Sequence, residues 1–259
     1  MAGTRRMTAF AVAVLVVTVV LVCGEVGARL RAHGAGASLD DDARAMITVG
    51  VELLATLASV VLALLLGSAK GDFDARAIEV RDAAVKLAML DDDLRVLGGA
   101  GAELRKELQA IVAFHTDAVW RGDAATATGS GSPPAIARIG AFQRELQAAS
   151  VATDTQRHAQ AHAASLLDDL RRVGFLARVH EGSTVIFPLL ALIVFWFGLI
   201  AGGLNVFAPR NVGMYALNIA CSLSVGGAVY LILEMDRTYG GAFGVSAEPL
   251  RAVLAQMER

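Results

Sequence analysis

The chain has few of the residues on which many soluble activities depend. It carries only two cysteines in 259 residues, Cys23 and Cys221, and both lie inside apolar runs. Structural metal sites need about four ligands, so these cysteines are interpreted as packing residues and not as a metal pair or a disulfide. Lysine and arginine number 23 against 25 acids, a formal net charge of −2. This balance excludes a strongly basic nucleic-acid binder.

Sequence patterns typical of enzymes are also missing. There is no nucleophile elbow and no phosphate-binding loop, and "GGAGA" at 98–102 lacks the context of a dinucleotide loop. His158 and His162 have the spacing of a helical metal pair, but no glutamate follows His158, which favours a solvated face. The acid runs at 39–44 and 90–95 lack calcium-loop spacing and are interpreted as solvated faces or caps. We expect no enzyme, no cofactor and no metal site.

Long apolar runs are what the sequence does contain. Four segments are almost free of charge, at residues 8–28, 46–69, 183–204 and 212–233. A helix of about 22 residues spans about 33 Å, enough to cross a hydrocarbon core of about 30 Å. Backbone groups in lipid must bond within their own segment, so each run is predicted to be an α-helix. The first run follows Arg5 and Arg6, as in a signal peptide, but its length favours a retained anchor.

The four runs divide the chain into a first transmembrane hairpin (1–69), a helical domain (70–182), a second hairpin (183–234) and a tail (235–259). Lysine and arginine are more frequent near one set of span ends, by ten to four. The positive-inside rule then places the N-terminus, the middle domain and the C-terminus in the cytoplasm of a multi-pass inner-membrane protein. The sequence therefore predicts an all-α integral membrane protein with four transmembrane helices and a cytoplasmic helical domain between the second and third.

The middle domain has helical periodicity and no strand alternation. A helix capped by Asp72 or Asp74 is predicted to end at "GGAGA", with Val80, Ala84, Leu87 and Leu94 on one face. A second helix carries Leu104, Leu108 and Ile111, and a flexible linker is predicted at 122–134. A third helix covers about 135–149, and "TDTQ" at 153–156 has the pattern of a capping box that opens a fourth.

Three marks resemble a known family. They are Phe207-Ala208-Pro209-Arg210-Asn211, the run "SLSVGG" at 222–227 and "LEMDR" at 233–237. With the Leu-Ala-Thr-Leu span that leads into Ser68-Ala69-Lys70, they resemble the bestrophin-like domain of unknown function, a bacterial membrane family. The resemblance implies likeness to bestrophins, which are homopentameric anion channels with four spans and a helical cytoplasmic part between spans two and three.

One stripe of the second run combines polar and small residues. Thr48, Glu52, Thr56, Ser59 and Ala63 share one side of the predicted helix. A charged group at the centre of a span costs about 2.5–3.5 kcal/mol on insertion scales, so Glu52 calls for an explanation. The stripe either lines an aqueous pore, where a ring of glutamates favours cations, or packs helices closely while Glu52 reaches the interface or meets Arg44.

Charged residues also mark the ends of the runs. Glu25 is interpreted as the partner of Arg29 in a boundary ion pair, and Ala216, Ala220, Ser224 and Ala228 as a helix-packing stripe. Glu234, Asp236 and Arg237 end the fourth run, where a helix C-terminus disfavours acids. The two acids are therefore expected to have partners, either to anchor the membrane base to the cytoplasmic helices or to form an ion site at a cytoplasmic mouth.

Two functions remain open on these grounds. The first is a bestrophin-like homo-oligomeric ion channel or pore of unknown selectivity, which the resemblance implies to be a pentamer. The second is a non-conducting membrane scaffold or sensor whose cytoplasmic helices bind a partner. The expected partners are the lipid bilayer, further copies of the chain and an inorganic ion, with no nucleic acid.

Overall fold

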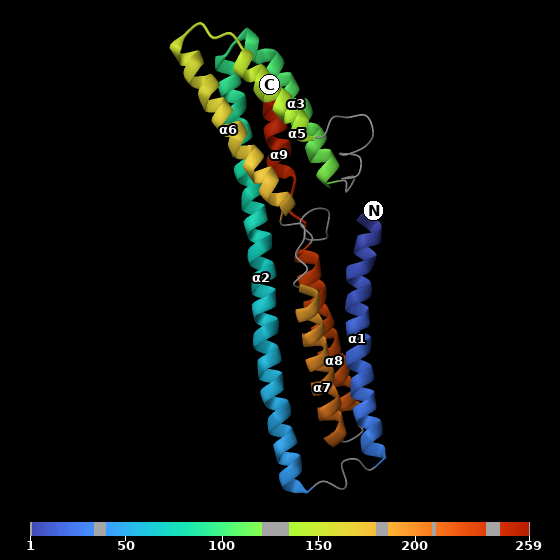
Figure 1. The fold of residues 1–259 in the computed structure, drawn as a ribbon. Coiled ribbons are helices and arrows are strands. Elements are labelled where there is room, and N and C mark those ends of the chain that lie inside the picture. The colour runs from blue at the N-terminus through green and yellow to red at the C-terminus, as the bar shows by residue number, and fades with distance from the viewer. Residues whose placement is uncertain are drawn as a thin grey trace. The chain divides into compact units, whose positions relative to one another are not determined.

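All regular structure in the described part of the chain is helical. The computed structural model describes residues 2–33, 40–120, 135–179, 186–208, 211–236 and 244–258, and these ranges hold eight helices and no strand. They are α1 (Ala2–Ala32), α2 (Asp41–Val96), α3 (Gly99–Trp120), α5 (Ala135–Ala148), α6 (Asp154–Val179), α7 (Ile186–Phe207), α8 (Val212–Met235) and α9 (Glu248–Met257) (Figure 1). Helices α1, α2, α7 and α8 are long and apolar enough to cross a membrane, which confirms the all-α class and the four apolar helices.

The chain divides into two compact units. The first, here called the amphipathic unit, comprises residues 1–2, 73–182 and 238–259. The second, here called the apolar unit, comprises residues 3–72 and 183–237. Helix α2 contributes to both units, because its residues up to Asp72 belong to the apolar unit and those from Phe73 to the amphipathic unit.

Helix α2 differs from its prediction. The sequence predicted a span that ends at 69 and a new helix capped by Asp72 or Asp74, but α2 is one helix of 56 residues without a break there (Figure 1). The prediction was wrong because the only breaker in the stretch, Gly71, is isolated, and an isolated glycine costs about 1 kcal/mol, less than a helix of this length gains from continuing. The linker predicted at 122–134 lies outside the described residues.

Close backbone approach holds the apolar unit together. A Cβ atom added to Gly27 on α1 would lie 2.1 Å from the carbonyl oxygen of Gly202 on α7, so the two backbones are in contact. On α8, a Cβ atom added to Gly226 would lie 2.3 Å from Val17 of α1. Small residues at such crossings are how membrane helices gain van der Waals contact without a hydrophobic driving force. A buried cluster then surrounds these crossings, made of Val16, Val20, Leu190, Ala201, Val225 and Val229.

The amphipathic unit has a conventional aliphatic core. The predicted faces of α2 and α3 are buried in it, as the near-zero exposure of Leu94 and the 3% exposure of Leu108 show. Phe142 and Leu146 of α5 enter the same cluster, with Ala163, Leu166 and Leu167 of α6 and Met257 of α9. Four helices and half of α2 thus share one core.

Two local signals in this unit acted as expected. Gly98 has a φ of 65° and separates α2 from α3, a conformation that favours glycine. Thr153 accepts a hydrogen bond from the backbone N–H of Gln156 at 3.2 Å, and the backbone N–H of Thr153 donates to Oε1 of Gln156 at 3.3 Å. This reciprocal pair confirms the capping box that opens α6.

The C-terminal segment is bonded to α3 at both of its ends. Near its start, the indole N–H of Trp120 donates to the carbonyl oxygen of Val245 at 2.7 Å. Near its end, Nη2 of Arg105 donates to the carbonyl oxygen of Met257 at 2.9 Å. Arginine at a helix C-terminus satisfies carbonyls that have no partner within the helix. Helix α9 is therefore held along α3 and belongs to the core of the amphipathic unit.

Candidate functional site

The polar stripe of α2 lies on an uncovered side of the chain. Thr48, Glu52, Thr56, Ser59 and Ala63 are all exposed. The side of α2 that packs within the apolar unit is a different one and includes Ala58, which is fully buried, and Val51, which lies beside Gly203 of α7. Only 6% of the most apolar stretch of α2 is buried, against 33% for α8. The stripe is thus free to face water, lipid or another protein chain.

The hydroxyl groups of this stripe are bonded to their own helix. Thr48 donates to the carbonyl oxygen of Arg44 at 2.9 Å, Thr56 to that of Glu52 at 2.9 Å, and Ser59 to that of Ala55 at 2.7 Å. Each donor is therefore satisfied without water, while each hydroxyl oxygen keeps acceptor capacity toward the outside. Together with the Glu52 carboxylate, the stripe presents oxygen acceptors, which is the chemistry that replaces the hydration shell of a cation.

A band of large apolar side chains runs beside this polar stripe. Leu53, Leu57, Val60 and Leu64 are all more than half exposed. Exposed leucine and valine over this length are expected where a helix meets lipid or a neighbouring apolar helix. The uncovered side of α2 therefore carries a polar strip and an apolar strip next to each other.

The ends of α1 and α7 carry the expected boundary pair and an additional contact. Nε of Arg29 lies 3.0 Å from Oε1 of Glu25, which confirms their ion pair. Nη1 of Arg31 donates to the carbonyl oxygen of Phe207 at 3.0 Å and so satisfies the last turn of α7. Glu25 is thus engaged in an ion pair on its own helix.

The acids at the end of α8 lie in contrasting surroundings. Glu234 is 1% exposed, whereas Asp236 is exposed at the helix C-cap. Both interact with other groups. Arg237, the third residue of this candidate site, lies outside the described residues. A buried carboxylate at a helix C-terminus is costly without such an interaction, so Glu234 has a fixed structural environment.

The small-residue stripe of α8 does not pack within this chain. Ala216, Ala220 and Ser224 are exposed and Ala228 is only partly buried, while α8 contacts α1 through the side that holds Gly226. The close helix–helix packing predicted for this stripe is therefore not made within the described residues, and packing against another chain stays a prediction. Helical spacing identified a small face correctly but does not tell which neighbour it meets.

The comparisons with known proteins add the family. A family model described as the Bestrophin-like domain matches residues 13–250, nearly the whole chain. The chain belongs to the Bestrophin-like domain family. No curated protein and no solved structure matches it. The matched range includes the α2 stripe, most of both apolar hairpins and most of the amphipathic unit, so all candidate residues of this Bestrophin-like chain lie inside the family domain.

A buried ion pair of the Bestrophin-like chain was missed from its sequence. Asp91 is 2% exposed and accepts from Nε of Arg105 at 2.6 Å and from Nε of Arg95 at 3.0 Å. The carboxylate of Asp91 raises the pKa of Arg105 by hydrogen bonding. The interpretation of residues 90–95 as a solvated face or cap was therefore wrong for Asp91. Its partner Arg105 lies on the next helix, and no local pattern links the two.

The described residues of this Bestrophin-like chain hold no group of three or more His, Cys, Asp and Glu side chains placed to bind a metal ion. His162, one of the two histidines with metal-pair spacing, instead lies with Nδ1 at 2.7 Å from Oδ2 of Asp93. This contact joins α6 to α2 at the surface. Its geometry explains His162 as a structural residue.

Proposed function

We propose that this Bestrophin-like protein forms a homo-oligomeric ion channel or pore, with the polar stripe of α2 on its conduction path. The observation that carries the proposal is the exposure of Thr48, Glu52, Thr56, Ser59 and Ala63 on a helix that packs within the chain through a different side. Burying a carboxylate against lipid is costly, whereas an aqueous axis between subunits would hydrate Glu52.

Several copies are needed because one chain cannot enclose a pore with this stripe. A ring of subunits would turn each polar strip toward the axis and leave the neighbouring band of Leu53, Leu57, Val60 and Leu64 to face the adjacent subunit or lipid. The exposed small residues of α8 offer a second surface on which a neighbouring helix can approach closely. A ring of Glu52 carboxylates favours cations, so selectivity for anions is not carried over from bestrophins.

The amphipathic unit favours a second candidate function, that of a scaffold or sensor. Ile78, Val85, Met89 and Val96 are 43–62% exposed and are spaced by seven, four and seven residues, which aligns them along one side of α2. An apolar line of this kind in water is typical of a protein-binding surface. It fits a further copy of the chain in the channel proposal or an unrelated partner in a non-conducting scaffold.

We place the protein in the bacterial inner membrane with the amphipathic unit in the cytoplasm. The excess of lysine and arginine near 70–182 and both termini supports this orientation. In this arrangement α2 carries the polar stripe and continues as one helix into the amphipathic unit.

Flux through liposomes tests the conduction proposal. The purified protein is reconstituted and the fluxes of K⁺, Cl⁻ and H⁺ are compared for the parent chain, Glu52→Gln and Glu25→Gln. We expect conduction by the parent, with the ratio of K⁺ to Cl⁻ flux lowered severalfold in Glu52→Gln because the carboxylate ring is neutralised. Glu25→Gln is the matched control, since it also removes one carboxylate but from the pair with Arg29.

Two results separate the candidate functions. A parent protein that is a closed dimer or monomer in mild detergent and carries no ion under any condition removes the channel proposal and leaves the scaffold. If Glu52→Gln and Glu25→Gln change conduction equally, the protein is still a channel but the α2 stripe does not lie on its conduction path.

A further inference from the structure

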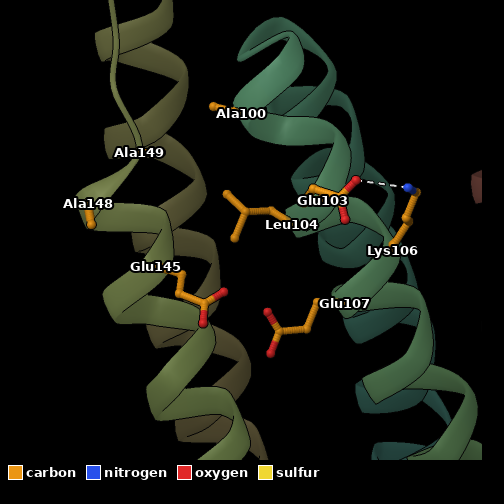
Figure 2. Close-up of a pocket in the computed structure, with 8 residues that line it drawn as sticks. All are labelled: Ala100, Glu103, Leu104, Lys106, Glu107, Glu145, Ala148 and Ala149. Atoms are coloured by element: carbon orange, nitrogen blue, oxygen red, sulfur yellow. Dashed lines mark hydrogen bonds and ion pairs between the residues drawn. The ribbon is translucent and has the colours of Figure 1, made fainter.

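A cleft in the amphipathic unit brings two carboxyl groups together. It lies between α3 and α5, has a volume of about 600 Å³, and is lined in part by the buried side chain of Leu104. Figure 2 shows the carboxyl groups of Glu107 on α3 and Glu145 on α5 pointing toward one another across this cleft. Its other lining residues are Ala100, Glu103, Lys106, Ala148 and Ala149.

The charges around the two carboxyl groups do not neutralise them. Lys106 lies 2.8 Å from Oε1 of Glu103 and pairs with that acid (Figure 2). Arg138 on α5 lowers the pKa of Glu107, but its guanidinium also lies over the ring of Phe114, 5.5 Å from the centroid. The opposing influences on Glu107 are larger. Burial raises its pKa first, and hydrogen bonding to Glu145 and repulsion from the Glu145 charge raise it further.

Two facing carboxyl groups have one favourable arrangement and one unfavourable one. When one of them holds a proton, it donates a hydrogen bond to the other, and the pair attracts. When both are ionised, two like charges face each other and repel. One proton therefore decides whether this pair of side chains attracts or repels across the contact between α3 and α5, and this holds whether or not the protein conducts ions.

We propose that Glu107 and Glu145 form a proton-operated latch, in which one shared proton holds α5 against α3 and loss of that proton loosens α5. The direction of the pH dependence follows from the raised pKa of Glu107 in the folded protein. The stabilisation that the shared proton contributes is complete below the ordinary glutamate pKa of about 4.3. It is lost as the pH rises through the raised pKa of Glu107. Acidification thus closes the latch and alkaline conditions release it.

Release of the latch has a defined structural consequence. Helix α5 supplies Phe142 and Leu146 to the core of the amphipathic unit, and these side chains are 1% and 0% exposed. Loosening of α5 gives water transient access to this part of the core. Its backbone amides then exchange faster, because local opening is what exposes them to solvent.

Hydrogen exchange on the full-length protein in detergent tests the latch. Protection factors of α5 amides (Ala135–Ala148), corrected for the intrinsic effect of pH, are compared at about pH 4.5 and about pH 7.5. For the parent we expect protection to fall by about three- to tenfold at the higher pH. In Glu107→Gln and in Glu145→Gln we expect the fall to disappear, because an amide donates the hydrogen bond at either pH.

Glu103→Gln is the control, since it removes a carboxylate from the same cleft that is already paired with Lys106. It should keep the parental pH dependence, and circular dichroism confirms that each variant keeps its helices. Equal protection of parental α5 at both pH values overturns the latch, as does a fall that persists in both glutamine variants. Restoration of protection at about pH 7.5 by millimolar Ca²⁺ or Mg²⁺ also overturns it, because the pair is then a cation site.

Discussion

At the residue scale, Asp91 shows how one buried carboxylate organises several helices. Its oxygens accept from Arg95 on its own helix and from Arg105 on α3, and Arg105 in turn donates to the carbonyl of Met257 at the end of α9. Each guanidinium group presents several N–H donors in a fixed plane, so the two arginines satisfy both carboxylate oxygens in a geometry that lysine cannot provide. Through Arg105, Asp91 thereby connects the end of α2 to α3 and to the C-terminal helix.

We predict that Asp91→Asn destabilises the protein by about 2–3 kcal/mol. The substitution leaves Arg105, which is only 23% exposed, without its counter-charge and also weakens its hold on α9. Denaturant unfolding followed by far-UV circular dichroism measures the loss. Asp92→Asn is the control because Asp92 is exposed beside it. Equal midpoints for the two variants would contradict a structural role for the buried carboxylate.

A glycine pair gives the second prediction at this scale. Gly27→Ala places a methyl group 2.1 Å from the carbonyl oxygen of Gly202, and backbone cannot move aside as a flexible side chain can. We expect α1 and α7 to separate and the melting temperature in detergent to fall by several degrees, as for overpacking that costs about 1–3 kcal/mol.

Gly67→Ala is the matched control for Gly27→Ala. Gly67 also lies inside a long apolar helix, but nothing lies within 4 Å of its Cβ position. Alanine should therefore be neutral or stabilising there by up to about 1 kcal/mol, through its higher helix propensity. If the two alanine variants melt at the same temperature, the contact between α1 and α7 is not as close as described.

Sequence patterns predicted those residues whose partners are near in the chain. The box of Thr153 and Gln156 and the turn at Gly98 depend on neighbours within a few positions, and both were predicted correctly. Asp91 depends on Arg105, which also donates to the carbonyl oxygen of Met257, and Glu107 depends on Glu145. These pairings exist only after helices have packed, so a pattern along the chain cannot distinguish a buried acid from a solvated one.

At the element scale, α2 has a different environment on each side. One side packs inside the chain, one presents hydroxyl groups and Glu52, and one exposes large apolar residues. The helical period predicted that Thr48, Glu52, Thr56, Ser59 and Ala63 share a stripe. Whether the stripe is covered depends on where α7 lies, which hydropathy does not encode. The same limit made the length of α2 unpredictable at Gly71.

The continuity of α2 is tested by proline at its weakest position. Gly71→Pro removes a backbone N–H and places the ring against the carbonyl of Gly67, which costs about 3 kcal/mol or more in a helix interior. We expect lower thermal stability and faster amide exchange at residues 67–75. Gly71→Ala is the control and should slow exchange there, because alanine favours the helix. Unchanged exchange in Gly71→Pro would show that α2 is already broken at this point.

At the scale of the whole molecule, the uncovered surfaces of α2 and α8 indicate what a single chain lacks. Three surfaces of α2 are uncovered in the single chain. They are the polar stripe with Glu52, the band of leucines beside it and the line of apolar residues from Ile78 to Val96. Lipid can cover only the band of leucines. It cannot hydrate the carboxylate of Glu52, and it does not reach the line from Ile78 to Val96 if that line lies outside the membrane. In the proposed oligomer, copies of the chain around an axis would cover all three surfaces.

The orientation of the molecule gives the last prediction. If the excess of lysine and arginine sets the topology, the segment before α2 faces outward and the amphipathic unit faces the cytoplasm. In a chain with Cys23→Ala and Cys221→Ala, a membrane-impermeant maleimide should label Asp42→Cys in intact cells. Ser165→Cys, on α6, should react only after the membrane is permeabilised. Both positions are exposed, so access to the reagent decides the result. Labelling of Ser165→Cys in sealed cells would reverse the topology and put the proton-operated latch outside the cell.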